Sequence, residues 1–561
     1  MAHQILAPVG GSLALSALVG ALPLLLLLVL LGVVRARAHW AAAWSLLAAL
    51  LIAVLAFDLP PAVALSGAAE GAAFGFLPIV WIIFNAVWVN RLLQESGHLR
   101  WVRHAFMSLS PDTRVQALVV AFCFGSLLEA MAGFGAPIAV VAAILLALGF
   151  SPVRAATVAL FADAAGTAFG SVGNPIFGLA KVTGLPAVEL GQMVGRQAAI
   201  VSFFVPFILL LALDGRRGLA QLWPVGATIG LGFAAGQLLT SNYVAFQLAD
   251  LVGAVIASGA AFALLRVWSP PGPDGSRTAP EAKPAPPGTP RRRDLLTPQR
   301  AGLGEAVEPG EPPSRAEVVR AFTPYGVLTV LLALVSIDNP VSTWVHSTAL
   351  KFRWPGVDVL DPGGHPLGIG RFTVDWLGAT GTVLLITGLI SMLVLRVAPR
   401  QGIGAYGRTL VQTRSAAATV VLVLAFAYVL NYSGQAVTIG VFLSGAGLAF
   451  VPLSPVLGWL GVAATGSDTS ANALFGAVQV ASARHLGISP FLLAAANSEA
   501  GSLGKLISPQ NLAMAAAAAG LAGREGTLFR RTLPWSLAYL ALFVVVVCLM
   551  AVGPLGWLVI G

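Results

Sequence analysis

The sequence predicts an all-α, polytopic membrane protein with two inverted-topology repeats, each containing a re-entrant helical hairpin and a discontinuous transmembrane helix. Three observations predict this fold: a composition poor in charge, apolar segments long enough to cross a bilayer, and a series of motifs that occurs once in each half. Of the 561 residues, 57% are hydrophobic and only 10% are charged, whereas soluble domains carry about 25% charged residues. Most of the chain must therefore lie in lipid.

The composition also excludes several other classes of protein. The net charge of +9 does not indicate nucleic-acid binding, because the arginines lie in short loops and one linker, as in the cytoplasmic loops of membrane proteins. Cys123 and Cys548 lie in apolar segments and are expected to be reduced packing residues. No zinc motif, catalytic triad or dinucleotide fingerprint is recognisable, so we expect neither an enzyme nor a cofactor.

The apolar segments predict about 12 spanning helices and two hairpins. Continuous spans are expected at 12–33, 40–57, 74–92, 193–213, 222–241, 248–268, 322–337, 372–395, 415–432 and 533–556. Two longer apolar blocks lie at 115–148 and 454–482, and each precedes a block that is interrupted by glycine, at 152–185 and 489–521. The interrupted blocks are the expected discontinuous helices.

A segment of different composition separates the two halves. Residues 269–315 hold twelve prolines and few apolar side chains, and such a segment cannot bury enough surface to fold. We expect a disordered cytoplasmic linker between an N-terminal transmembrane half, 1–268, and a C-terminal half, 316–561.

The basic loops predict an orientation in the membrane. With the arginine-rich loops in the cytoplasm, both termini are extracytoplasmic. The number of membrane crossings agrees with this orientation only if 115–148 enters and leaves the membrane from the cytoplasm and 454–482 enters and leaves it from outside. A straight helix over 115–148 would run about 51 Å, against a hydrocarbon core of about 30 Å, and a re-entrant hairpin removes that excess.

The two halves share one order of motifs: an acid, a Gly-x-Ser-Pro sequence, then a second acid. The members are Glu129, 149–152 and Asp163 in the first half, and Asp468, 487–490 and Glu499 in the second. Because the hairpins enter from opposite sides, this order predicts an inverted repeat. Transporters use such repeats to expose one midplane site alternately to either side.

Glycine-rich breaks occur at membrane depth at 132–137 and 166–175, and again at 465–470 and 501–509. Irregular backbone is tolerated there only where it is buried in protein or lines a cavity. Free N–H groups at the start of a half-helix suit a small anion; the alternative is that the glycines only permit close helix packing. The residues expected to bind the substrate are Gly133, Phe134, Gly135, Asn174, Ser467, Thr469, Ser470, Asn472, Lys505 and Ser508.

Four acids inside apolar segments are candidates for proton coupling, because an intramembrane acid is costly and therefore functional by default. Glu129 and Asp468 come first, and Asp163 and Glu499 second. A carboxyl kept protonated by desolvation can lose its proton when a cavity opens. The alternatives are a helix cap or a buried hydrogen bond.

Only four of the basic residues are lysines. Lys505 lies in a broken segment and is a candidate partner for a carboxylate; alternatively, it forms an ion pair with Glu499 or Asp468 that only stabilises packing. Lys181 is closer to a span end and is expected to be structural. Glu70 is expected to be structural or solvated.

Several segments resemble the lactate permease family, namely 124–137, 191–197, 431–434, 465–472 and 504–510. The resemblance implies proton-coupled uptake of L-lactate, and often D-lactate and glycolate, across a bacterial inner membrane. Glu129, Asp468, Asn472 and Lys505 match family motif positions. Asp163 and Glu499 depart from the pattern, since the family commonly has an Asn and a small hydroxyl residue there.

We therefore expect a secondary transporter that moves a small 2-hydroxy monocarboxylate with a proton through a lipid bilayer. The alternative is a sodium-coupled or exchanging carrier of another organic anion, such as a dicarboxylate, since unwound carbonyls can also hold Na⁺. A third reading, an anion channel or a receptor, is disfavoured by the paired hairpins. The sequence does not indicate an oligomeric state.

Overall fold

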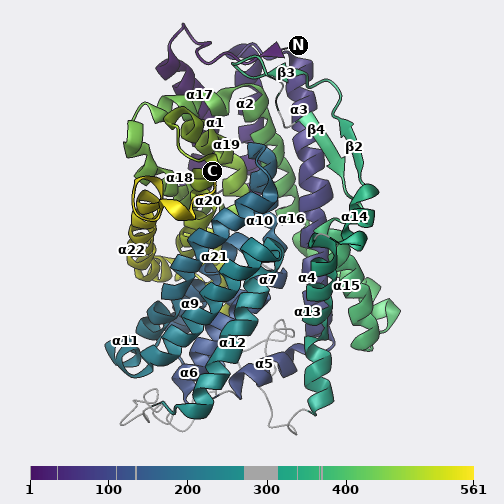
Figure 1. Ribbon diagram of the computed structural model, residues 1–561, viewed down its shortest axis with the longest axis vertical. Coiled ribbons are helices and arrows are strands. Elements are labelled where there is room, and N and C mark those ends of the chain that lie inside the picture. Colours follow the sequence, from purple (N-terminus) through teal and green to yellow (C-terminus); the bar gives the residue numbers. More distant parts are fainter. Residues whose placement is uncertain are drawn as a thin grey trace.

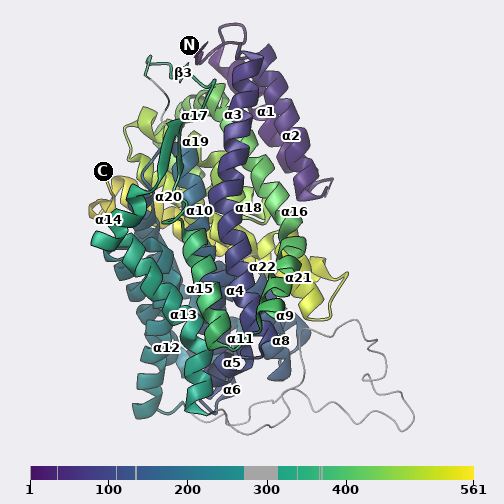
Figure 2. The same cartoon turned by 90° about the vertical axis from the view of Figure 1, so that its right-hand side faces the viewer.

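The computed structural model describes residues 2–34, 36–108, 110–132, 135–270, 314–337, 339–365, 367 and 370–561. Most of the expected linker, as well as Gly133 and Phe134, lies outside these ranges. The described chain is an elongated bundle of helices with two small sheets near the end that carries the N-terminus (Figures 1 and 2).

Helices make up nearly all of the described structure. The first half contains α1 (Leu13–Gly32), α2 (Ala38–Leu55), α3 (Pro61–Phe74), η1 (Gly75–Val80), α4 (Trp81–Glu95), α5 (Leu99–Met107), α6 (Thr113–Val119), η2 (Val120–Phe124), α7 (Gly125–Ala132), α8 (Ala136–Ala147), α9 (Pro152–Ala164), η3 (Thr167–Phe169), α10 (Gly170–Thr183), α11 (Ala187–Tyr243), η4 (Phe246–Leu248) and α12 (Ala249–Val267). The second half contains α13 (Arg315–Ser336), α14 (Pro340–Ser347), α15 (Thr380–Val394), α16 (Pro399–Tyr432), α17 (Gln435–Ser444), η7 (Gly447–Ala449), α18 (Phe450–Thr465), α19 (Asp468–Leu486), α20 (Pro490–Gly504), η8 (Lys505–Ile507), α21 (Pro509–Ala518), α22 (Glu525–Val552) and η9 (Gly556–Leu558).

The prediction of an all-α, polytopic membrane protein is confirmed. Among the described residues, ten helices are long and apolar enough to cross a membrane, and the bent pair α9–α10 would make an eleventh. The 57 residues of α11 would measure about 86 Å as one straight helix, far more than one span needs. Non-helical backbone at Asp214 and Gly215 divides α11, and a Cβ on Gly230 would lie 2.5 Å from the carbonyl oxygen of Phe203. The element is therefore two antiparallel helices, matching the two expected spans.

Two expected span boundaries were wrong. The span expected from residue 74 begins at Pro61 and runs through the π-helical turn η1 to Glu95. Its glycine-rich first turns are packed rather than exposed, since a Cβ on Gly71 would lie 2.5 Å from the carbonyl oxygen of Leu424 in α16. The span expected from residue 372 begins only at Thr380.

The residues before Thr380 instead form part of a sheet. Strand β4 (Arg371–Val374) pairs antiparallel with β2 (Leu350–Arg353). Strand β1 (Ala2–His3) pairs in parallel with β3 (Val359–Leu360). The long loop between α14 and α15 therefore lies over the N-terminal end of the bundle (Figure 1).

Both expected hairpins are present. In the first, α6, η2 and α7 lead to a tip near Gly135 and α8 returns, so that a Cβ on Gly125 would lie 3.4 Å from Cγ2 of Val141. In the second, α18 and α19 meet at Gly466, and the Ser454 hydroxyl donates a 2.7 Å hydrogen bond to Oε1 of Gln479. The first hairpin joins the chain at the lower end of the bundle in Figures 1 and 2 and the second at the upper end.

A discontinuous helix follows each hairpin. Between α9 and α10 the axis bends by 57°, and Ser171 and Val172 have left-handed backbone, with φ of 47° and 59°. In the second half, α20 passes through the 3₁₀ turn η8 into α21, and Pro509 opens the new helix. The breaks fall where the sequence places glycine and proline, as expected.

Each hairpin contacts the opposite half as well as its own. The returning arm α8 packs against α21 of the second half, and α19 packs against α10 of the first. Gly135 and Gly178 permit these approaches, since a Cβ on Gly135 would overlap the Met514 side chain and one on Gly178 would lie 3.2 Å from Cγ2 of Thr469. The four broken elements therefore meet in the middle of the molecule.

Candidate functional site

An ion cluster joins the two discontinuous helices to the first hairpin. The Nζ atom of Lys505, at the start of η8, lies 2.9 Å from Oε1 of Glu129 in α7 and 2.7 Å from Oδ2 of Asp163 in α9. All three side chains are buried. Lys505 therefore lies between two acids of the first half, rather than in the ion pair with Glu499 or Asp468 that was the expected alternative.

The second hairpin acid has neutral partners. Asp468 begins α19, and its Oδ2 atom accepts a 2.7 Å hydrogen bond from the Ser498 hydroxyl of α20. The amide of Asn472 donates to that hydroxyl at 2.9 Å and to the carbonyl oxygen of Pro175 at 3.3 Å. Asn472 thus connects hairpin, discontinuous helix and the opposite half.

In both halves a glycine of the discontinuous helix lies against the hairpin acid. A Cβ on Gly170 would lie 2.7 Å from Oε1 of Glu129, and a Cβ on Gly501 would overlap Oδ1 of Asp468. Real Cβ atoms do not make such contacts, so a larger residue at either position would displace the carboxyl group. The glycines bring helix backbone against the two carboxyl groups, which is more than general helix packing demands.

Polar side-chain atoms without partners surround these acids. Buried polar groups are normally hydrogen-bonded, so unpaired ones indicate a water, ion or ligand position. Among the described residues, the unpaired buried atoms in the hairpins, the discontinuous helices and the start of α12 are Ser126 Oγ, Glu129 Oε2, Asp163 Oδ1, Asn174 Oδ1 and Nδ2, Asp250 Oδ2, Asp468 Oδ1, Ser470 Oγ and Ser502 Oγ.

The candidate binding residues separate into three groups. Asn174, Ser470 and Asn472 are buried at the meeting point of the broken elements. Ser467 and Ser508 act instead as N-caps, accepting from the backbone N–H of Ser470 and Asn511 at 3.3 Å. Their hydroxyls are therefore engaged within the protein. Thr469 and Gly135 pack against the opposite half, as described above.

Asp250 was not foreseen as a member of the site. It lies in the first turn of α12, is 1% exposed, and accepts a 2.8 Å hydrogen bond from Nε2 of Gln237. A Cβ on Gly166, in the first break, would lie 2.7 Å from its Oδ2 atom and 3.7 Å from Cγ of Glu129. Asp250 falls within the expected span 248–268, so the rule for intramembrane acids would have identified it.

Glu499 is the fifth buried acid of this region, after Glu129, Asp163, Asp250 and Asp468. Its side chain in α20 is 2% exposed and lies within electrostatic range of Asp468 and Asp250. Lys505 is the one lysine among the buried charged residues that the structure describes. Such an excess of carboxyl groups over cations is sustainable in a low-dielectric interior only if several carboxyls are protonated.

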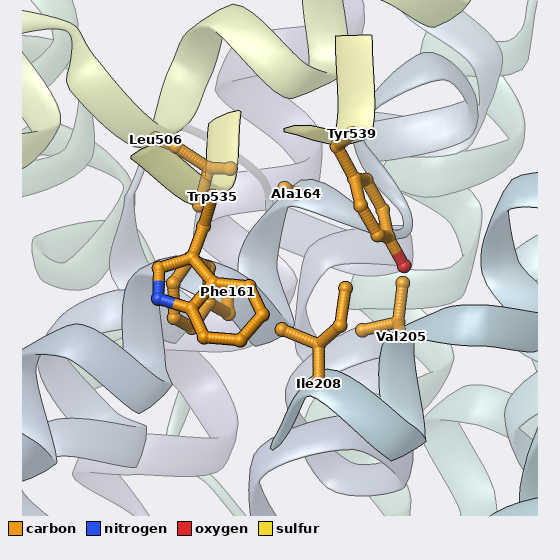
Figure 3. Close-up of a pocket in the computed structure, with 7 residues that line it drawn as sticks. All are labelled: Phe161, Ala164, Val205, Ile208, Leu506, Trp535 and Tyr539. Atoms are coloured by element: carbon orange, nitrogen blue, oxygen red, sulfur yellow. The ribbon is translucent and has the colours of Figure 1, made fainter. Parts of the chain in front are cut away.

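A small apolar pocket is lined by residues of the elements that carry the ion cluster (Figure 3). Two of its lining residues, Ala164 and Leu506, directly follow Asp163 and Lys505 in sequence. The aromatic rings of Phe161, Trp535 and Tyr539 also line it, and the first two are in edge contact with centroids 5.9 Å apart. With a volume of about 10 Å³, the pocket has room for one water at most.

Comparison with known proteins identifies the family. A family model described as L-lactate permease matches residues 16–553. The chain is 37% identical to the glycolate permease GlcA of Escherichia coli (strain K12), with 99% of each chain covered. It is 35% identical to the L-lactate permease of Bacillus subtilis (strain 168), again with 99% of each covered. It is 36% identical to the L-lactate permease of Escherichia coli (strain K12), covering 96% of this chain and 97% of that one. The chain therefore belongs to the L-lactate permease family.

Proposed function

We propose that this protein is a secondary active transporter that carries L-lactate, or a related small 2-hydroxy monocarboxylate such as D-lactate or glycolate, together with a proton across the inner membrane. The observation that carries the proposal is the position of Lys505 between Glu129 and Asp163, at 2.9 and 2.7 Å. The names of the relatives support the substrate class.

The charges of the ion cluster give a reason why transport of the anion would be coupled to a proton. When both acids are ionised, they hold the lysine and give the cluster a net negative charge, which opposes the arrival of an anion. When one acid takes up a proton, Lys505 is released from it and can pair with the carboxylate of the substrate. Proton and anion then enter together because each makes the site favourable for the other.

The neutral groups fit the rest of the substrate. The unpaired amide of Asn174 and hydroxyl of Ser470 can bond to the carboxylate and to the 2-hydroxyl group, since amides and hydroxyls both donate and accept. In this assignment Asn472 orients Asp468 through the Ser498 hydroxyl and binds the opposite half through the carbonyl oxygen of Pro175. Asp468 and Glu499 are further proton-carrying groups, and Asp250 joins them.

The hairpins that bridge the two halves provide a basis for the movement. Each returning arm lies against the opposite half, so rocking one half against the other would open the site on one side while closing it on the other. The proposal includes extracytoplasmic positions for both termini, consistent with the basic loops.

Uptake by purified protein in proteoliposomes tests the proposal. With the lumen alkaline and no sodium present, labelled L-lactate should accumulate above its external concentration, and a protonophore should abolish the accumulation. Accumulation that requires a sodium gradient would instead support the alternative carrier of organic anions. Flux that never exceeds equilibrium would support a channel and contradict the proposal.

A further inference from the structure

A second pocket opens near the C-terminal end of α10, close to the end of the bundle that carries the N-terminus and the β2–β4 sheet (Figure 1). Its volume is about 370 Å³, within the range of about 300–1,000 Å³ that small-molecule sites occupy. The residues that line it are Phe74, Phe177, Ala180, Lys181, Gly184, Leu185 and Pro186. Apart from Lys181, these side chains are apolar or absent.

Lys181 gives this pocket a positive charge. Its Nζ atom donates a 2.7 Å hydrogen bond to the carbonyl oxygen of Arg371 in β4, which leaves two further donors. None of the ion pairs between described residues involves Lys181. The acid that acts on it, Glu70, is fully buried and accepts the hydroxyl hydrogen bond of Tyr432.

Aromatic rings surround the ammonium group. Nζ of Lys181 lies 5.6 Å from the ring centre of Phe74 and 5.8 Å from that of Phe372. A cation with spare donors among apolar walls suits a small organic anion, because the charge binds the carboxylate and the rings accept the carbon chain. The same surroundings would reject a strongly hydrated inorganic cation.

The pocket is linked to the central site along one face of α10. Asn174, Phe177 and Lys181 are three and seven residues apart, so they lie on the same side of the helix. Asn174 and Lys181 are therefore separated by about 10 Å along the axis. Phe177 lies between them, lines the pocket, and packs against the ring of Phe246 with centroids 5.2 Å apart.

We propose that this pocket is an antechamber in which Lys181 captures the monocarboxylate from the aqueous phase before it passes Phe177 to reach Asn174. This inference rests on the proposed transport of a small monocarboxylate. It assigns Lys181 a role in substrate binding, whereas a purely structural lysine would only stabilise the contact between the end of α10 and β4.

Kinetics of charge variants provide the first test. Lys181→Met should raise the KM for L-lactate about five- to tenfold, as expected for the loss of one charge-assisted contact, while kcat stays within about twofold. Lys181→Arg should keep the wild-type KM. An unchanged KM in Lys181→Met, or an equal rise in both variants, would contradict the antechamber.

Restoring the charge chemically provides the second test. In a Cys123→Ala, Cys548→Ala background that still transports, Lys181→Cys should regain a low KM after reaction with an aminoethyl thiosulfonate and lose more activity after a sulfonatoethyl reagent. L-Lactate should slow both reactions. Failure of the aminoethyl group to restore affinity, or reaction rates unaffected by lactate, would overturn the inference.

The exposed Lys351 of β2 provides the matched control. Lys351→Cys should react at a rate that lactate does not change, and its modification should leave KM unaltered. If the variants at position 181 do not fold, Phe177→Leu should still change the rate of substrate passage. Wild-type protein that takes up no lactate at all would refute the proposed function, whereas normal wild-type uptake with indifferent variants refutes the antechamber alone.

Discussion

The Nζ atom of Lys505 lies 2.7 Å from Oδ2 of Asp163, so the second discontinuous helix is bound to the first through their two breaks. Asp163 adds a second carboxylate beside a lysine that already contacts Glu129. This carboxylate, at a position where we expected a departure from the family pattern, changes the charge of the ion cluster, and its effects can be measured.

Asp163→Asn should make anion binding easier. With one carboxylate removed, Lys505 is more available, so we expect the KM for L-lactate at pH 8 to fall about three- to tenfold, the effect of removing one nearby like charge. The KM for L-lactate is obtained from initial uptake rates at pH 6 and pH 8. Glu499→Ser, which removes a buried carboxyl that makes no ion pair with Lys505, serves as the comparison; a KM that rises in Asp163→Asn would argue against the cluster as the anion site.

Lys505→Met should disable transport and destabilise the protein. Removing the lysine leaves two buried acids without a cation, and breaking a buried ion pair on one side costs about 3–5 kcal/mol. Thermal unfolding in detergent should show the loss of stability. Adding Glu129→Gln and Asp163→Asn should restore stability but not transport, and recovery of uptake in that triple variant would show that the charges are only structural.

Gly170→Ala should block transport with a moderate loss of stability. The new methyl group would meet Oε1 of Glu129 at 2.7 Å, and overpacking of this kind costs about 1–3 kcal/mol. Uptake and thermal unfolding are the measurements. Gly259→Ala in α12 is the matched control, since a Cβ there has open space around it and should change neither property; normal transport by Gly170→Ala would contradict the close approach.

Asp250→Asn should change the dependence of uptake on pH while preserving the fold. Asparagine keeps the shape of the side chain and an acceptor for Gln237, so stability should stay within about 1 kcal/mol. The uptake rate is compared between pH 5 and pH 9 with the wild type. Asp58→Asn is the control, because Asp58 is exposed and its φ of 53° is one that asparagine adopts; identical pH profiles would exclude Asp250 from proton coupling.

The hairpins and breaks could be predicted because their causes are local. Glycine and proline mark the interruptions, and a 34-residue apolar block must fold back to fit the bilayer. The start of the span at Pro61 was missed because glycine-rich turns resemble a loop until α16 is seen packed against them. Similarly, the strand at Arg371 depends on its pairing with β2.

The partners of the charged residues could not be predicted, because they join segments far apart in the chain. Lys505 and Glu129 are 376 residues apart, and no spacing rule connects them. Asp250 is different, since an acid inside an apolar span is visible in the sequence. It lies outside the repeated motifs, so the repeat does not point to it.

The contacts of the returning arms with the opposite half also bear on the evolutionary origin of the fold. Because α8 lies against α21 as well as α9, and α19 lies against α10 as well as α20, one half on its own would leave one face of its returning arm uncovered and its site unfinished. Two copies inserted in opposite orientations would satisfy both arms at once. A single-half ancestor could therefore have worked only as an antiparallel dimer, and fusing two such genes through a linker would have allowed each copy to diverge, leaving the lysine of one half facing the acids of the other.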